Sequence, residues 1–551
     1  MLYREICKIL GFYLLFLCVV LLLPLGIAAY YEYVVLQADH PQPHSTAAFA
    51  YTLLITLALS GLFSLIGRHS TTALYRREGL AVVVFVWLLT PAIASLPFLF
   101  SGTLKRFDQA YFEVVSGFTT TGSSILQAKN YDPKTGEEIP FVYKYSGIEN
   151  KTYEFYGNIE PIRDPVTHKI LFKGVEAVGT ALLFWRSFTL WLGGVGIVIL
   201  FVALLPALGV GGKVLFQAES MGPVKEGDTP RIKQKASRLW KIYIGITLAQ
   251  TILLMVTNRE LPWLDAVTIA FGTVATGGFS VRNDSIASYH NGSTELIVFI
   301  FMIMGSINFY LYYYLFKGKF IRFFDPEFIV FMLSILGFGL LSSWYLIGVP
   351  KMSIDGHLTG QVYSWWEALR YGGFQAVSAH TTTGFVTANY DNWPSVIQML
   401  MLVSMYIGAM SGSTGGGIKV IRHYMLFRIV QHKIELIFRP QAVRTFRIGN
   451  KEIDSNVAMT ALCFFVVIIA VTTLGVFLYI MDGIDAETAL GVMASSVNNG
   501  GMGFRAAGVG HSLAFMSPFS TYCSILWMIL GRLEFFAVLV MLVPAFWKQN
   551  S

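Results

Sequence analysis

The stretch that decides the fold runs from residue 107 to residue 123 and reads Phe107-Asp-Gln-Ala-Tyr-Phe-Glu-Val-Val-Ser-Gly-Phe-Thr-Thr-Thr-Gly122-Ser. A run of helix length is followed at once by three threonines and a glycine. The run is too short to cross a bilayer, which takes roughly 20 apolar residues, and longer apolar segments flank it on both sides. This pattern predicts a re-entrant segment. Irregular backbone persists at membrane depth only where protein buries it or where it lines water.

Three later stretches repeat the pattern. Each has a helix-length run, then hydroxyl or amide side chains, then glycine, and each lies between two apolar segments. The three stretches read Leu264-Asp-Ala-Val-Thr-Ile-Ala-Phe-Gly-Thr-Val-Ala-Thr-Gly277-Gly-Phe-Ser, Phe374-Gln-Ala-Val-Ser-Ala-His-Thr-Thr-Thr-Gly384-Phe and Val492-Met-Ala-Ser-Ser-Val-Asn-Asn-Gly-Gly501-Met-Gly-Phe. A four-fold recurrence of span, short pore helix, filter segment and span predicts one repeated architecture around a central pore.

The composition agrees with a chain embedded largely in lipid. Of the 551 residues 54% are hydrophobic and 13% are charged, whereas a soluble domain carries roughly 25% charged residues. The sequence predicts ten spans, near 9–30, 47–66, 79–101, 180–208, 240–257, 294–316, 327–348, 395–418, 455–480 and 519–546. The expected fold class is therefore an all-α polytopic membrane protein, with four pseudo-fourfold repeats preceded by two extra transmembrane helices.

These spans divide the chain into five regions. Two N-terminal transmembrane helices occupy 1–78, and the repeats occupy 79–239, 240–326, 327–453 and 454–551. The first span also has the basic and then apolar pattern of a secretory signal, and we interpret it as a retained helix. The first repeat carries a polar insert at 127–175 without an apolar span. We interpret this insert as a small external cap, with a β-hairpin as one candidate form.

The basic residues predict the orientation. Loops near 68–77, 213–241, 317–322 and 422–451 are rich in Lys and Arg, they alternate along the chain, and they lie on the same side as Arg4, Lys8 and Lys548. The positive-inside rule places that side in the cytoplasm. Both termini are then cytoplasmic and the four filter segments face outward. The formal charge of +7 needs no nucleic-acid partner, because this topology explains it.

The filter segments have the chemistry of a cation pathway. A cation that leaves water needs other oxygens, which rings of backbone carbonyls supply. Glycine tolerates the positive φ that such tight backbone requires, and neighbouring Thr and Asn side chains offer oxygens that hold the loop. A filter without carboxylates favours a monovalent cation. Asp108, Asp265 and Asp485 complement the N-termini of three pore helices, whereas the third helix has Arg370 at that place.

At these residues the chain resembles the TrkH type of the Trk/Ktr/HKT superfamily of K⁺ transport proteins, over nearly its whole length. The motifs are the four filter segments, the run Gly408-Ala-Met-Ser-Gly-Ser-Thr-Gly-Gly-Gly-Ile-Lys419-Val-Ile-Arg422, and Gly531-Arg-Leu-Glu534. The resemblance implies K⁺ uptake across a bacterial cytoplasmic membrane, without any cofactor besides the transported ion. It also implies a homodimer and a cytoplasmic TrkA-like nucleotide-binding subunit.

The resemblance also implies roles for individual residues. The expected K⁺-binding residues are Thr120, Thr121, Gly122, Ala275, Thr276, Gly277, Thr382, Thr383, Gly384, Asn499, Gly500 and Gly501. The loop 408–417 would obstruct the pore as a gate, with its core at Gly412, Ser413, Thr414, Gly415, Gly416 and Gly417 and with Arg532 directed toward it. In the family a Ser at the position of Gly122 accompanies Na⁺ transport, so the glycine predicts preference for K⁺.

Several alternatives accompany this interpretation. A proton- or sodium-coupled K⁺ symporter would normally show carboxylates within its spans, and few are found here. An enzyme would need a catalytic constellation facing a cavity, and the chain shows none. The four cysteines have no paired spacing, which predicts neither disulfides nor a metal site beyond K⁺ at the filter. Asn308 suits helix–helix hydrogen bonding and pore lining equally well.

Overall fold

The computed structural model describes residues 3–35, 44–69, 76–132, 135–146, 150–164, 167, 169–194, 196, 231–354, 356–439, 447–448, 451–452 and 455–547. Most of the basic loop predicted near 213–241 lies outside these residues.

The described helices follow one another along the whole chain. In chain order they are α1 (Tyr3–Ala29), η1 (Tyr30–Val34), α2 (Ser45–Ile66), α3 (Arg76–Ala94), α4 (Leu96–Phe100), α5 (Phe107–Phe118), η2 (Gly174–Ala177), α6 (Thr180–Gly194), α9 (Arg231–Thr257), α10 (Trp263–Val274), η4 (Ser285–Tyr289), α11 (Gly292–Ser306), α12 (Phe309–Phe316), η5 (Phe320–Phe324), α13 (Pro326–Leu346), α14 (Trp365–Glu367), η6 (Ala368–Gly372), α15 (Gly373–His380), η7 (Tyr390–Asn392), α16 (Ser395–Ile407), α17 (Val420–Phe438), α18 (Ser455–Met481), α19 (Ala486–Asn498), η8 (Arg505–Ala507), η9 (Leu513–Phe515), α20 (Pro518–Arg532), α21 (Phe536–Met541) and α22 (Pro544–Trp547).

The strands form five two-stranded antiparallel sheets. They pair β1 (Asn130–Tyr131) with β2 (Glu138–Ile139), β3 (Phe141–Ser146) with β4 (Asn150–Phe155), β5 (Ile162–Arg163) with β6 (Ile170–Phe172), β7 (Pro350–Met352) with β8 (Leu358–Val362), and β9 (Arg447–Ile448) with β10 (Lys451–Glu452). The first three pairs lie in the polar insert. The protein is therefore mostly helical, as expected, and the β-hairpin suggested for the insert is present as β3 and β4. The pairs β7–β8 and β9–β10 are strands that the all-α prediction did not include.

Local sequence signals set many helix starts. Asp325 accepts a hydrogen bond from the Glu327 N–H, and Pro326 follows it at the first position of α13. Ser517 caps α20 in the same way, again with proline next. A side-chain acceptor satisfies a backbone N–H that has no partner within the helix, and proline at the first position loses nothing because its missing N–H would be unpaired there.

Among the described residues, fewer continuous spans are present than the sequence predicted, and residues 197–208 of the span predicted near 180–208 lie outside them. Six described helices are long and apolar enough to cross a membrane, and the pair α11 and α12 makes a seventh if its 96° bend is counted within one span. The predicted spans near 395–418 and 519–546 are interrupted as well. Helix α16 ends before Gly408, which has a φ of 71°, and α20 ends before Glu534 and Phe535, both of which have positive φ.

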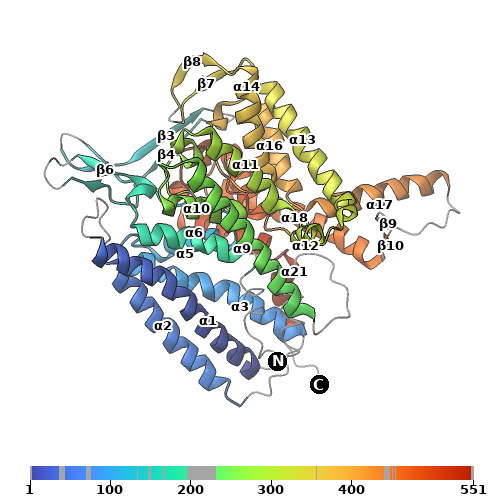
Figure 1. The fold of residues 1–551 in the computed structure, drawn as a ribbon, viewed down its shortest axis with the longest axis horizontal. Coiled ribbons are helices and arrows are strands. Elements are labelled where there is room, and N and C mark those ends of the chain that lie inside the picture. The colour runs from blue at the N-terminus through green and yellow to red at the C-terminus, as the bar shows by residue number, and fades with distance from the viewer. Residues whose placement is uncertain are drawn as a thin grey trace.

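The first two helices pack side by side as an antiparallel pair along one flank (Figure 1). Their close approach depends on small residues, because the Ser60 Oγ donates to the Gly11 carbonyl over 2.7 Å. The Tyr13 hydroxyl lies 2.5 Å from the Thr90 Oγ1 and so joins α1 to α3. Side-chain hydrogen bonds of this kind hold helices together in lipid, where the hydrophobic effect between helices is absent.

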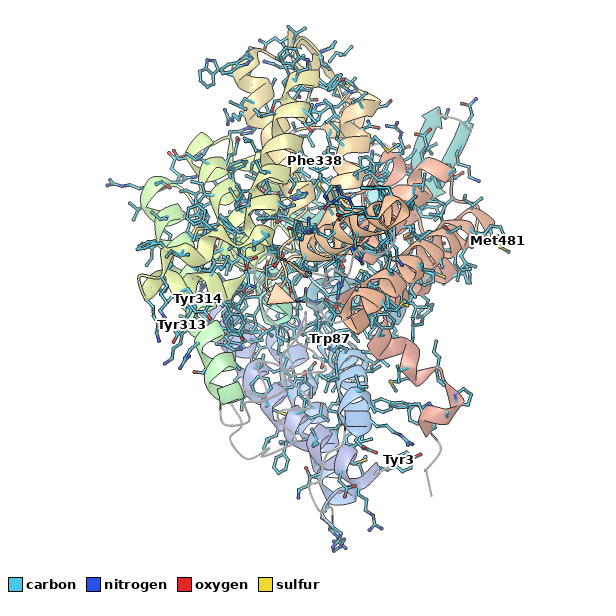
Figure 2. All side chains as sticks on the ribbon, turned by 90° about the vertical axis from the view of Figure 1, so that its right-hand side faces the viewer. Tyr3, Trp87, Tyr313, Tyr314, Phe338 and Met481 are labelled. Carbon is cyan, nitrogen blue, oxygen red and sulfur yellow. The ribbon has the colours of Figure 1, made fainter. Side chains whose placement is uncertain are left out.

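Apolar side chains cover the outer surface of the molecule between its two ends. Figure 1 shows the N-terminus at the end opposite the β7–β8 hairpin, and Figure 2 shows Tyr3, at the start of α1, toward the lower end of the molecule. Between these ends, apolar side chains project outward around the body, with Tyr313 and Met481 at opposite margins in Figure 2. Met481 is 67% exposed. Such outward apolar surface is what a bilayer covers.

We predict that Gly11→Val destabilises the protein and that Gly26→Val in the same helix does not. A Cβ at Gly11 would lie 2.4 Å from the Ser64 Oγ and 2.9 Å from the Ser64 backbone nitrogen, whereas nothing lies within 4 Å of a Cβ at Gly26. Overpacking of this kind costs about 1–3 kcal/mol. Thermal unfolding in detergent measures the difference, and equal midpoints for the two variants would contradict the packing described.

Candidate cation site

Each of the four short pore helices ends in the same unusual backbone. The residue that starts each filter segment is left-handed although it is not glycine: φ is 58° at Thr120, 52° at Thr276, 54° at Thr382 and 53° at Asn499. A glycine with positive φ follows two residues later, at Gly122, Gly278, Gly384 and Gly501. Threonine seldom adopts this conformation. Its recurrence at four places marks strain of the kind that functional sites hold.

Hydrogen bonds give the register of the four segments independently. The residue after each left-handed position donates its N–H to a carbonyl five residues back in its pore helix. These bonds are Thr121 to Ser116 at 2.9 Å, Gly277 to Gly272 at 2.8 Å, Thr383 to Ser378 at 2.9 Å and Gly500 to Ser495 at 2.9 Å. Gly277 therefore corresponds to Thr121, and Gly278 corresponds to Gly122.

This register shifts the second segment by one residue from the sequence-based alignment. Counting to the first glycine paired Gly277 with Gly122 and placed Ala275 among the binding residues. In the structure Ala275 occupies the helical position before the left-handed residue, and the equivalent triplet is Thr276, Gly277 and Gly278. The consecutive glycines concealed the shift, because only backbone conformation shows which of them has positive φ.

The four segments approach one another in a closed cycle. A Cβ built at Gly122 would lie 1.8 Å from the Gly277 carbonyl oxygen, and one at Gly278 would lie 2.0 Å from that of Thr383. In the same way, a Cβ at Gly384 would lie 2.9 Å from the Gly500 carbonyl oxygen, and one at Gly501 would lie 2.5 Å from that of Thr121. Each segment thus touches the next, and the fourth touches the first. Only glycine allows backbone to approach backbone this closely.

Buried side-chain oxygens support the segments, in agreement with the sequence analysis. The hydroxyls of Thr119 and Thr121 lie 2.8 Å apart, and those of Thr381 and Thr383 repeat this distance. The fourth segment uses an amide instead. The Asn499 Nδ2 donates to the Thr121 Oγ1 over 3.0 Å and to the Met528 carbonyl over 2.9 Å. Asn499 therefore ties the fourth segment both to the first segment and to α20.

The loop 408–417 lies directly against the inner ends of three segments. The Thr414 hydroxyl lies 2.9 Å from the Val274 carbonyl oxygen and 3.2 Å from the Thr276 hydroxyl. The Gly416 N–H donates to the Thr382 Oγ1 over 2.6 Å. The Gly417 N–H donates to the Asn498 carbonyl over 3.0 Å. The loop is therefore docked on the second, third and fourth pore helices or segments.

Arg532 supplies the connection to the first repeat. This side chain is 3% exposed, and it donates to the carbonyls of Gly193 at 2.5 Å and Gly194 at 2.9 Å. It also donates to the Thr414 carbonyl at 3.0 Å and to the Thr120 Oγ1 at 3.2 Å. One guanidinium thus joins the end of α6, the first filter segment and the loop. The sequence placed Arg532 near the loop, whereas its contacts with the first repeat appear only in the structure.

Charged residues also surround the far side of the loop. Lys419 is buried and donates to the Gly415 carbonyl. Arg422 forms an ion pair with Glu534, and the Glu327 carboxylate accepts the Ser411 N–H at 2.6 Å. The loop is thus held from both sides by ionic groups.

Asn308 answers one question that the sequence left open. It caps α12, because its Oδ1 accepts the Tyr310 N–H over 2.9 Å. A Cβ at Gly412 would lie 3.1 Å from the Asn308 amide. Asn308 therefore starts the helix after the bend and faces the loop 408–417. This role differs from both helix–helix hydrogen bonding and pore lining, the two roles that the sequence suggested.

Three further glycines of this site escaped the sequence analysis as a set. A Cβ at Gly193 would lie 1.9 Å from the Phe118 carbonyl oxygen, one at Gly305 would lie 2.9 Å from that of Val274, and one at Gly531 would lie 2.1 Å from that of Val497. These carbonyls hold the same position at the end of three pore helices. The sequence signal that could have identified them is a glycine in the span that follows the first, second and fourth filter segments.

Comparisons with known proteins identify the family and the fold. The sequence model of the TrkH family, described as a cation transport protein, matches residues 165–549. The chain is 30% identical to the Trk system potassium uptake protein TrkH of Salmonella typhimurium, over 99% of this chain and 100% of that protein. It is also 30% identical to TrkH of Escherichia coli K12, over 91% and 92% of the two chains. The crystal structure of the potassium transporter TrkH from Vibrio parahaemolyticus superposes with a TM-score of 0.77 at 26% identity and covers 100% of both chains.

The register predicts that Gly278→Ala impairs cation uptake far more than Gly277→Ala. Alanine at 278 must adopt positive φ and meets the Thr383 carbonyl at 2.0 Å, whereas a Cβ at Gly277 first meets the Leu190 side chain, which can turn aside. A strained left-handed residue costs about 1–3 kcal/mol, so we expect uptake to fall by roughly tenfold or more at 278. Rubidium uptake by proteoliposomes measures this. Equal losses in the two variants would restore the sequence-based alignment.

Proposed function

Because the chain belongs to the TrkH family of cation transport proteins, we propose that it takes up K⁺ through a central pore lined by the four filter segments. The observation that carries this proposal is the closed cycle in which each filter glycine approaches a carbonyl of the next segment. Four equivalent loops around one axis place backbone oxygens in stacked rings. Such rings replace the hydration shell of a cation.

The proposed ligands follow the structural register. They are the carbonyls of Thr120 and Thr121, Thr276 and Gly277, Thr382 and Thr383, and Asn499 and Gly500, with Gly122, Gly278, Gly384 and Gly501 shaping the loops. All of these residues are Thr, Gly or Asn, so the filter has no fixed negative charge of its own. A neutral ring of oxygens binds a monovalent ion weakly enough to release it. In this proposal the four repeats are related by pseudo-fourfold symmetry.

The loop 408–417 is the proposed gate. It is docked against the inner ends of the second, third and fourth filter segments. Arg532 connects it to the first repeat. A loop in that place blocks an ion that has left the filter. The guanidinium adds a positive charge beside the path, and a fixed cation raises the barrier for another cation. Opening then requires that Arg532 exchange its carbonyl partners for others.

The assembly that we propose follows the relatives that belong to the Trk system. Helix α17 projects from the body (Figure 1), and its exposed side chains include Phe427 and Ile437. A projecting helix with exposed apolar side chains of this kind suits the surface of a second copy, which gives a homodimer. A TrkA-like nucleotide-binding subunit would bind the cytoplasmic face, in a bacterial inner membrane with both termini inside.

Coupled transport is the second candidate. Glu327 is a buried carboxylate that contacts the gate loop through the Ser411 N–H. A carboxylate at that depth is the group that a proton-coupled mechanism would use. The pore remains our first proposal, because the carbonyl ring explains conduction without a protonation step.

Flux in liposomes tests the proposed function. We expect a K⁺ gradient alone to drive uptake into proteoliposomes, K⁺ to be preferred over Na⁺, and a proton gradient to be unnecessary. Gly122→Ser is the matched variant, since its side chain would displace the Gly277 carbonyl, and its ratio of K⁺ to Na⁺ uptake should fall severalfold. Strict dependence on a proton or sodium gradient would favour the symporter instead.

The gate generates a separate prediction about Arg532. Arg532→Ala should raise K⁺ flux severalfold, because it removes both the positive charge and the hydrogen bonds to the loop. Arg532→Lys keeps the charge but has fewer donors in a different geometry, so its flux should fall between alanine and wild type. Unchanged flux in well-folded Arg532→Ala protein would show that Arg532 is not part of a gate.

A further inference from the structure

Polar clamps join consecutive repeats around the outer rim of the filter. Between the first and second repeats, Arg186 of α6 pairs with the buried Glu113 at 2.5 Å. The same guanidinium donates to the Ser280 carbonyl over 2.8 Å and lies 3.5 Å above the ring of Phe279, next to the second filter. Glu113 in turn accepts the Ile125 N–H at 2.9 Å. One ion pair thus holds the outer flanks of two filters.

The next two boundaries also have an arginine among the described residues. Arg370, in the third repeat, binds Glu295 of α11 through two hydrogen bonds of 2.6 and 2.7 Å. Arg505, in the fourth repeat, donates its backbone N–H to the Asp391 Oδ1 over 2.8 Å and its guanidinium Nη1 to the Asp391 carbonyl over 2.9 Å, and Asp391 follows the third filter. Three of the four boundaries are therefore crossed by a charged side chain.

The boundary between the fourth and first repeats is crossed by the polar insert. Tyr153 of strand β4 donates its hydroxyl hydrogen to Asp485, and the same hydroxyl oxygen accepts the Asp485 N–H over 2.9 Å. Nearby, the Ser512 Oγ donates to the Gln127 Oε1 over 2.8 Å. The insert is thus bonded to the fourth repeat although it belongs to the first.

Asp485 is the residue on which the fourth pore helix begins. Its side chain accepts the Thr488 N–H over 2.9 Å as the N-cap of α19. Helix α19 runs to Asn498, and the fourth filter segment follows without an intervening residue. A rigid helix passes a change at its cap to its other end. The Tyr153 hydroxyl and the Asn499 carbonyl are therefore joined by one short element.

Aromatic packing fixes the hairpin that carries Tyr153. The Tyr153 ring lies 5.0 Å from that of Phe515, and the Tyr143 ring lies 4.3 Å from that of His511, both in the outer loop of the fourth repeat. Tyr153 is 7% exposed. Burial, and then the hydrogen bond to the Asp485 carboxylate, raise the pKa of the Tyr153 hydroxyl. The hydroxyl therefore stays protonated and keeps donating at physiological pH.

We propose that Tyr153 is a positioning residue for cation selection, because it bonds to the cap of α19 and thereby sets the place of the fourth filter segment. The inference rests on the proposed filter. The fourth segment lacks the threonine pair that supports the first and third segments, because Asn498 and Gly500 stand at those two positions. The insert is thus a part of the filter assembly that is supplied by the first repeat.

Tyr153→Phe is the variant that tests this proposal, since it removes one oxygen and keeps the ring packed on Phe515. We expect its ratio of K⁺ to Na⁺ uptake in proteoliposomes to fall roughly three- to tenfold, the range that the loss of one ordinary hydrogen bond allows. Tyr156→Phe is the matched control. Tyr156 is 58% exposed and directly follows the same strand, so its ratio should equal that of wild type.

Asp485→Asn gives a second route to the same measurement. An amide at position 485 is a weaker acceptor for the Tyr153 hydroxyl, so the ratio of K⁺ to Na⁺ uptake should fall in this variant as well. In the double variant the ratio should fall by less than the product of the two single fold-changes, because both substitutions remove the same hydrogen bond. If Tyr153→Phe fails to fold, Asp485→Asn carries the expectation alone. A lower thermal midpoint with an unchanged ratio in the folded variant would overturn the proposal, because the clamp would then be structural only. A wild type that shows no K⁺ preference would overturn the proposed function first.

Discussion

The structure depends on one constraint, which is the close approach of four glycines to four carbonyls. Each filter glycine lies where a Cβ would come within 1.8 to 2.9 Å of a carbonyl oxygen in the next segment. No segment can hold its conformation alone, because its neighbour sets the space available to it. The pore helices, the spans beside them and the outer clamps all serve to bring these backbones together.

The interrupted spans follow from the same constraint. A helix broken inside a membrane exposes carbonyls that lipid cannot satisfy. Here Arg532 covers the carbonyls of Gly193 and Gly194 at the end of α6, and Asn308 caps the helix that starts after the bend below α11. In turn, the carbonyl oxygens stabilise a buried guanidinium that has four acceptors around it. The breaks, the arginine and the loop 408–417 therefore form one unit, in which each part satisfies groups that another part leaves unpaired.

At the outer rim, charged side chains hold neighbouring repeats together. Filter segments that touch mostly through backbone need lateral support, and Arg186, Arg370 and Arg505 each connect one repeat with the next. At the fourth boundary Tyr153 of the insert takes this place. The insert, which the sequence predicted as a small external cap on the first repeat, is thereby bonded to the fourth repeat as well, and its aromatic side chains pack there.

The sequence by itself determined the membrane class and the four helix-and-glycine segments, because composition, periodicity and short motifs are local properties of a chain. The family resemblance, rather than these patterns, implied that Arg532 lies near the loop 408–417. Tertiary structure alone decided that Gly278 rather than Gly277 is the partner of Gly122, since two adjacent glycines differ only in backbone conformation. It also decided where the spans near 294–316 and 519–546 break, whereas the resemblance already implied the loop 408–417 within the span near 395–418. Apolar residues fill both halves of the first two spans, and the break in each follows from groups that lie far away in sequence. The same holds for Tyr153 and Asp485, which are 332 residues apart and meet only because the four segments close into a cycle.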